Sequence, residues 1–309
     1  MSGVAVDISD LSKSYGTTTA LRAVSLTIPA GGMTSIVGPD GAGKTTLIKL
    51  LTGILEPDRG SVHILGFDTV REFDSLKKHI GYLSQNFTLY GDLSVDENIE
   101  FFAEIHSVRN FKARREELLG FTRLEPFRAR QAERLSGGMK QKLALACTLI
   151  HSPRVIFLDE PTTGVDPVSR REFWLILADL LRRDITIVMT TPYMDEAERS
   201  GLVGLLHRGR LLHAAPPAAL KALYRGTITE AVTSDARRAA RIIEEALPDL
   251  EVQIFGDRVH VLAAGNGKNV TRIRKILAGH GLEVERARTV TPSLENVFIS
   301  LIKQEETHA

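Results

Sequence analysis

The strongest local pattern in the sequence is a run of eight residues, Gly38-Pro39-Asp40-Gly41-Ala42-Gly43-Lys44-Thr45, which matches the phosphate-binding pattern G-x-x-x-x-G-K-[ST]. Met33–Val37 before it predicts a buried strand, and the leucine spacing after it predicts a helix over Thr45–Leu55. Glycines let the backbone wrap a polyphosphate, so that successive amides and the helix start point at its oxygens. We expect Lys44 to reach the β- and γ-phosphates, Thr45 to bind Mg²⁺, and the contacts to extend to Thr46.

Two carboxylates follow a second apolar run, Val155–Leu158. Such a run is typical of a strand buried on both faces of a parallel sheet, and ligands bind at the carboxyl edge of such sheets. Asp159 is predicted to hold Mg²⁺ through water, and Glu160 to polarise an attacking water as a general base. By itself an acidic pair often marks only the end of a strand.

A third element is Leu135-Ser136-Gly137-Gly138-Met139, followed by the apolar helical segment Gln141–Ile150. Ser-Gly-Gly at the start of a helix offers a second anion site. The element resembles the signature motif of the ATP-binding-cassette (ABC) family, and its distance from the acidic strand is similar to that in the family. The resemblance covers roughly residues 4–220. It implies that the polyphosphate is ATP, bound with Mg²⁺.

The resemblance also implies roles for single residues. Ser136, Gly137 and Gly138 would contact the γ-phosphate of ATP held by an opposite ATPase subunit. Gln85, in Tyr82-Leu-Ser-Gln-Asn, matches the glutamine that contacts Mg²⁺ and water.

Two further positions match the family. Tyr15 falls where an aromatic ring stacks on adenine, although a tyrosine that merely packs at a strand end stays an open alternative. Asp166, in Gly164-Val-Asp-Pro167, lies in the loop that crosses the dimer interface. Whether the partner is a second copy or a different ATPase chain stays open.

One position departs from the family. A histidine is usual after the strand that follows the acidic pair, and here Pro192 precedes Tyr193-Met-Asp-Glu-Ala197. Proline has neither a side-chain donor nor a backbone N–H, so that only Thr190, Thr191 or a water could substitute in part. The intact base Glu160 favours slowed hydrolysis. The alternative is a degenerate site paired with a complete site on another chain.

The fold class predicted is α/β: a P-loop ABC cassette with a mixed sheet and a helical signature subdomain over residues 1–222. Residues 223–309 are predicted to form a small α+β ferredoxin-like domain. Its strands and helices read β-α-β-β-α-β, with Gly256-Asp257 as a hairpin turn. A role in dimer stabilisation or regulation is a hypothesis.

Several segments look like those of ATPase subunits of bacterial multidrug and antibiotic exporters, including Gln85–Tyr90, Asp92–Asn98 and the tail motif Pro292–Phe298. This resemblance implies a separate transmembrane permease, and Phe87 and Tyr90 are the predicted contacts with it. No apolar run of about 18 residues is present, and the N-terminus does not look like a signal peptide. The expected location is therefore the cytoplasmic face of the inner membrane, held there by the permease.

Composition and motifs weigh against other classes. With 39 basic and 38 acidic residues, the net charge of +1 does not suggest a nucleic-acid binder. The single cysteine, Cys147, excludes an internal disulfide. A non-transport ABC ATPase of repair, chromosome organisation or translation stays an alternative, although the chain lacks a coiled-coil insertion or a second cassette. The Ser136–Gly138 element disfavours a kinase or GTPase.

Overall fold

The structure is a computed structural model that describes residues 3–86, 89–224, 226–264 and 269–308. The chain divides into two compact units, Met1–Pro217 and Ala218–Ala309. The predicted boundary, between residues 222 and 223, lies at the opposite end of the short helix α8 (Pro217–Ala222) from this division.

Unit 1 is built on a six-stranded sheet in the order β10-β9-β3-β8-β7-β6. The strands from β9 to β6 are parallel, and β10 is antiparallel at the edge. Strands such as β3 and β7, in which every residue is buried, need cover on both faces of the sheet. The bounds are β3 Met33–Val37, β6 Ile80–Leu83, β7 Val155–Asp159, β8 Thr186–Thr191, β9 Leu202–His207 and β10 Arg210–Ala215.

A second, antiparallel sheet of unit 1 has the order β2-β1-β4-β5. Its inner side chains and helix α1 (Lys44–Leu51) enter one hydrophobic core together with β3, β7 and β8. The predicted mixed sheet is thus confirmed, as two sheets that share a core. The bounds are β1 Val4–Tyr15, β2 Thr18–Pro29, β4 Arg59–Ile64 and β5 Phe67–Asp68; the short helix α2 is Phe73–Leu76.

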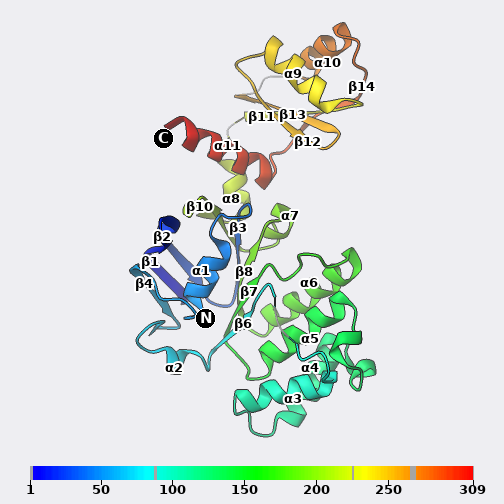
Figure 1. The fold of residues 1–309 in the computed structure, drawn as a ribbon. Coiled ribbons are helices and arrows are strands. Elements are labelled where there is room, and N and C mark those ends of the chain that lie inside the picture. The colour runs from blue at the N-terminus through cyan, green and yellow to red at the C-terminus, as the bar shows by residue number, and fades with distance from the viewer. Residues whose placement is uncertain (1–2, 87–88, 225, 265–268, 309) are drawn as a thin grey trace. The chain divides into compact units, whose positions relative to one another are not determined.

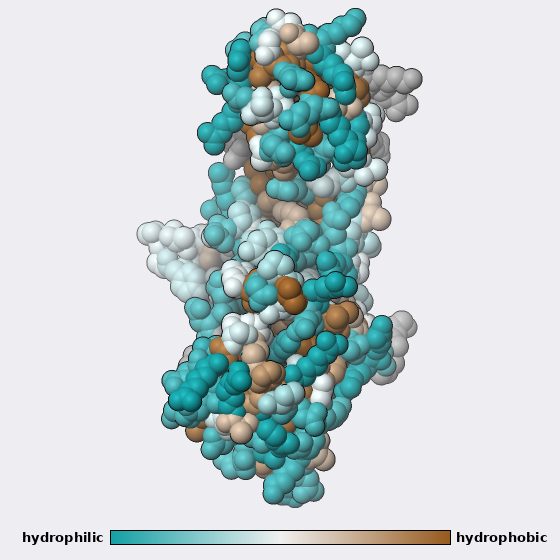
Figure 2. All heavy atoms as spheres, turned by 90° about the vertical axis from the view of Figure 1, so that its right-hand side faces the viewer, coloured by the Kyte–Doolittle hydropathy of each residue, from teal (hydrophilic) through white to brown (hydrophobic). Residues whose placement is uncertain are grey.

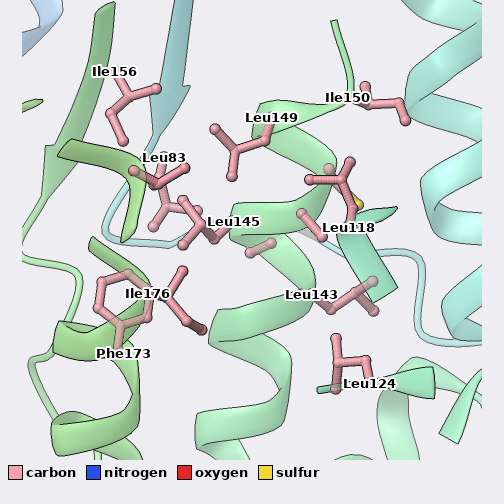
Figure 3. Close-up of a cluster of buried hydrophobic side chains, with 14 of the residues drawn as sticks. Leu83, Leu118, Leu124, Leu143, Leu145, Leu149, Ile150, Ile156, Phe173 and Ile176 are labelled. Atoms are coloured by element: carbon pink, nitrogen blue, oxygen red, sulfur yellow. The ribbon is translucent and has the colours of Figure 1, made fainter. Parts of the chain in front are cut away.

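The helices α3 (Val95–Ile105), α4 (Phe111–Thr122), α5 (Gly137–Leu149) and α6 (Pro167–Arg182) gather in one part of unit 1 (Figure 1). Helix α5 is apolar around most of its circumference, because it lies in the middle of a second core. Figure 3 shows Leu143, Leu145 and Leu149 of α5 among side chains such as Leu118 of α4 and Phe173 of α6. This helical subdomain is the one that the fold prediction named.

Unit 2 has the predicted order of elements, and its sheet runs β12-β13-β11-β14 with every pair antiparallel. This is the split βαβ arrangement, which confirms the ferredoxin-like prediction. Helices α9 and α10 pack on one face of the sheet around Ala231, Val259 and Val261. The bounds are β11 Gly226–Thr233, α9 Ala236–Ala246, β12 Glu251–Phe255, β13 Arg258–Ala264, α10 Val270–Gly279, β14 Val284–Val290 and α11 Leu294–His308.

The side of the molecule presented in Figure 2 is largely hydrophilic, with hydrophobic residues in small separate groups, as expected of a surface in contact with water. Within the described ranges, no helix combines the length and apolar character that crossing a bilayer requires.

Candidate functional site

The glycine-rich loop runs from the end of β3 into α1, as predicted. Its shape depends on glycine at two positions. A Cβ on Gly38 would lie 2.1 Å from the carbonyl oxygen of Leu206, and one on Gly43 would lie 2.6 Å from that of Ala20. Gly43 also has φ +105°, a conformation that side chains rarely adopt. The backbone therefore closes tightly around the place where α1 begins.

Lys44 is the first residue of α1, and only 4% of its side chain is exposed. Its Nζ donates hydrogen bonds to the carbonyl oxygens of Gly38 (2.8 Å) and Pro39 (3.0 Å). The same nitrogen lies 3.1 Å from Oε1 of Glu160. The loop thus holds a cation at its centre, in the position that phosphate oxygens require.

Asp159 is the last residue of β7 and is 1% exposed. Its Oδ1 accepts hydrogen bonds from the hydroxyls of Thr45 (3.3 Å) and Thr190 (2.6 Å). Its Oδ2 is buried and accepts no hydrogen bond from the described residues. A buried carboxylate oxygen without a partner beside a threonine hydroxyl fits the oxygen ligands that Mg²⁺ prefers. Thr45 and Asp159 would therefore hold the ion.

The phenol of Tyr82, on β6, is also close to this carboxylate. Burial, and then the charge of Asp159, raise the pKa of Tyr82 to about 12. Tyr82 therefore stays neutral at the pH of a cell.

Glu160 directly follows β7 and has φ +49°, an uncommon conformation for a residue with a side chain. Strain of this kind is typical of functional sites. Its Oε2 accepts hydrogen bonds from Nε2 of Gln85 (3.3 Å) and the hydroxyl of Thr163 (3.3 Å). Lys44, Gln85 and Glu160 thus meet at the carboxyl edge of the sheet, where a base could face a water near the terminal phosphate.

The signature residues form a second cluster. Ser136 caps the start of α5 by accepting from the amide of Met139 (3.3 Å). A Cβ placed on Gly138 would lie only 2.2 Å from the hydroxyl oxygen of Ser169, so that a side chain at this position would clash with α6. Asp166 caps α6, and hydrogen bonds from the backbone of Ser169 and other groups lower the pKa of this carboxyl. The Ser136–Gly138 element and the loop that ends at Asp166 are therefore neighbours, through α5 and α6.

Comparisons with known proteins identify the family to which the chain belongs. A family model described as "ABC transporter" matches residues 21–163. The Nod factor export ATP-binding protein I of Rhizobium sp. is 34% identical, over 99% of this chain and 99% of that protein. This chain belongs to the ABC transporter family.

Other relatives are also named as ATP-binding proteins. A probable multidrug ABC transporter ATP-binding protein of Escherichia coli is 40% identical over 92% of this chain, and the chain spans about half (49%) of that relative's length. A daunorubicin resistance ATP-binding protein of Streptomyces coeruleorubidus is 32% identical over 97% of this chain and 96% of its own length.

Solved cassettes share the fold. A dimeric post-hydrolysis cassette, MJ0796, bound to ADP and Pi, aligns with a TM-score of 0.63 and 26% identity over 68% of this chain and 98% of that one. The cbiO1 protein of Clostridium perfringens aligns with a TM-score of 0.65 and 26% identity over 80% of this chain and 96% of that one.

The remaining ABC-family positions have clear places. Tyr15 ends β1 and is 49% exposed, so its ring is open to a partner rather than packed in the core. Its stacking on adenine stays a prediction. Pro192 directly follows β8, and the two threonines before it are buried. Thr190 bonds to Asp159, and the Thr191 hydroxyl donates to Oε2 of Glu196 (2.7 Å), so neither hydroxyl is free in this conformation to replace the histidine.

Two residues of the ABC site were missed or misassigned by sequence reasoning. Thr163 was not considered, although it donates to the proposed base. Thr190 was considered only as a substitute for the histidine, and its contact with Asp159 was not foreseen. The strand register, which places Thr190 opposite Asp159, is the signal that would have revealed it.

Proposed function

We propose that this chain hydrolyses ATP and thereby powers an exporter whose membrane-spanning permease is made of other polypeptides. The observation that carries the proposal is the contact of Glu160 with both Lys44 and Gln85 at the mouth of the phosphate loop. A phosphate-binding cation and a carboxylate base in contact are what hydrolysis of a terminal phosphate requires.

Each residue has a task in this proposal. The loop amides and Lys44 bind the β- and γ-phosphates. Gln85 and Thr163 orient the carboxylate of Glu160, which accepts a proton from the attacking water. A Mg²⁺ ion at Thr45 and Asp159 would neutralise phosphate charge.

We propose that two cassettes close around two ATP molecules, with Ser136, Gly137 and Gly138 of one facing the phosphates bound by the other. Supporting this, α5 begins at Gly137, the N-terminus of a helix suits an anion, and Asp166 caps the start of the neighbouring helix α6. A monomer would then hydrolyse poorly, because half of each site is missing.

The permease surface is proposed to include Tyr90. The residue is 43% exposed, and its ring packs edge-on against that of Phe101, with centroids 4.4 Å apart. Phe102 turns toward the helical core instead. Phe87, the other predicted contact, lies outside the described residues. Bound in this way, the chain would sit at the cytoplasmic face of the membrane.

The relatives' names favour a multidrug or antibiotic-like cargo for the exporter. A second candidate function is that of a nucleotide-binding partner subunit with little hydrolysis. It is favoured by Pro192, which supplies no donor where the family has histidine.

The test is ATP turnover of the chain assembled with its permease, comparing wild type, Glu160→Gln and Glu245→Gln. Glu245 is an exposed acid on α9 and is the matched control. We expect Glu160→Gln to bind ATP but to lose turnover by at least about a hundredfold, the usual contribution of a general base. Equal, near-zero turnover of wild type and Glu160→Gln, with ATP still bound, would instead support the partner-subunit function.

A further inference from the structure

The strands that carry the two halves of the phosphate site are not neighbours. The phosphate loop follows β3 and the acidic pair ends β7, and β8 lies between them in the sheet. In the parallel register, Thr190 of β8 lies opposite Ile36 of β3 on one side and Asp159 of β7 on the other. The end of β8 therefore lies between the two halves of the site, where a side chain can touch the acidic pair.

Thr190 makes this contact with its hydroxyl. The Oγ1 donates to Oδ1 of Asp159 at 2.6 Å and accepts from the backbone N–H of Glu160 at 3.1 Å. The same N–H also lies 3.1 Å from the carbonyl oxygen of Thr190. A single residue, 0% exposed, thus bonds to both acids of the pair.

These bonds constrain both carboxylates. Because Oδ1 of Asp159 is engaged by the hydroxyls of Thr190 and Thr45, the carboxylate is turned so that Oδ2 has no hydrogen-bond partner among the described residues. Because the amide of Glu160 is held at two points, the residue keeps its unusual φ of +49°. That backbone geometry aims the Glu160 side chain at Lys44 and Gln85.

We infer that Thr190 is a positioning residue for ATP hydrolysis: its hydroxyl sets the direction of the metal-binding oxygen of Asp159 and of the base Glu160 together. This inference rests on the proposed function. The role matters more in this chain because Pro192 contributes no side-chain donor to the same site.

A purely structural role for the hydroxyl is the competing explanation, and β8 offers a matched control. Thr186, at the other end of the strand, is 2% exposed, and its hydroxyl accepts one hydrogen bond from the amide of Gly31 at 2.9 Å. Thr186→Val therefore removes a buried hydroxyl from the same strand, far from the acidic pair.

The experiment compares Thr190→Val, Thr190→Ala, Thr190→Ser and Thr186→Val with wild type, each assembled with the permease. We measure kcat, the KM for ATP and the Mg²⁺ concentration for half-maximal turnover. For Thr190→Val and Thr190→Ala we expect kcat to fall about tenfold, as for loss of a hydrogen bond to a charged group, with a higher Mg²⁺ requirement and an almost unchanged KM. Thr190→Ser should restore kcat, and Thr186→Val should keep it while losing similar thermal stability.

Equal kcat in Thr190→Val and Thr186→Val, or failure of Thr190→Ser to restore it, would overturn the inference. If Thr190→Val does not fold, Thr190→Ala, which leaves room for a water, decides the same question.

If wild type binds ATP without turnover, the proposed function fails, and the inference is tested by ATP binding instead. The gain in ATP affinity on replacing EDTA with Mg²⁺ should then be severalfold smaller in Thr190→Ala than in Thr186→Val. Equal gains would overturn it independently.

Discussion

Position 192 is where the chain departs most from its family at the level of single residues. Pro192 follows Thr191, whose hydroxyl donates to Glu196 and accepts from the amide of Tyr193 at 3.1 Å. Glu196 is fully buried and also bonds to Arg170 (2.6 Å) and Thr162 (2.6 Å). The backbone after β8 is thus fixed by hydrogen bonds on both sides of the proline, and a replacement side chain would start from a defined position.

We predict that Pro192→His raises ATP turnover of the assembled complex. A histidine at this position adds a donor for the developing charge on the terminal phosphate, and one such donor is worth on the order of tenfold or more in rate. Steady-state phosphate release measures the effect, with Pro192→Ala as the control that removes the ring and adds no donor. Turnover of Pro192→His no higher than that of Pro192→Ala would contradict the prediction.

Part of the site could be predicted at this scale. Lys44, Thr45 and Asp159 follow from local patterns, since each lies beside an apolar strand or within a motif whose spacing is informative. Their contacts with one another fit those roles, which stay predictions until ligands are bound. The contacts of Thr163 and Thr190 with the acidic pair could not be predicted, because they depend on a loop conformation and on a strand register that a single sequence does not specify.

At the level of elements, the close approach of α5 and α6 sets the geometry of the signature cluster. The first turn of α5 lies against Ser169 of α6, which is possible only because residue 138 has no side chain. Gly137, one residue earlier, faces open space: nothing lies within 4 Å of a Cβ built on it. Packing against α6 therefore requires glycine at position 138, whereas the space around position 137 would admit a side chain.

We predict that Gly138→Ala lowers the free energy of unfolding of unit 1 by roughly 1–3 kcal/mol, the usual cost of overpacking. Gly137→Ala should leave it unchanged or raise it slightly, because alanine favours helix. Urea denaturation followed by circular dichroism distinguishes the two variants. Equal stabilities would show that α5 and α6 can separate at no cost. Activity is not the readout, because both glycines are candidate phosphate contacts.

Element boundaries were less predictable than element types. The helix predicted over Thr45–Leu55 ends at Leu51, because Gly53 takes a left-handed conformation two residues later. The strand predicted over Val4–Ile8 continues to Tyr15, as it is paired with β2 through several register shifts. Such irregular pairing depends on the neighbouring strand and leaves little local signal.

The whole molecule consists of two units with separate cores, and its one cysteine lies in unit 1. Cys147 is fully buried on α5, and burial raises the pKa of its thiol. The topology of unit 2 was predictable as a whole, since its short strands alternate with amphipathic helices. The strand order of the larger sheet of unit 1 was not predictable, because strands that are neighbours in this sheet are mostly far apart in the sequence.

We predict that a thiol reagent such as DTNB modifies Cys147 only when unit 1 opens. The native protein should react at least about a thousandfold more slowly than the unfolded chain, since a buried neutral thiol is a poor nucleophile. The modification rate across a urea titration should follow the unfolding of unit 1 and be insensitive to that of unit 2. Rapid labelling in the absence of urea would mean that the helical core opens readily.

The position of β8 between β3 and β7 has a consequence for how the protein folds while it is being synthesised. A ribosome makes the phosphate loop early and the acidic pair much later, yet the strand that separates them in the sheet is made last of the three. Until Thr191 has emerged, the two halves of the site have no common framework, and Lys44 has no fixed carboxylate opposite it. Nucleotide binding should therefore begin abruptly during synthesis, when β8 enters the sheet.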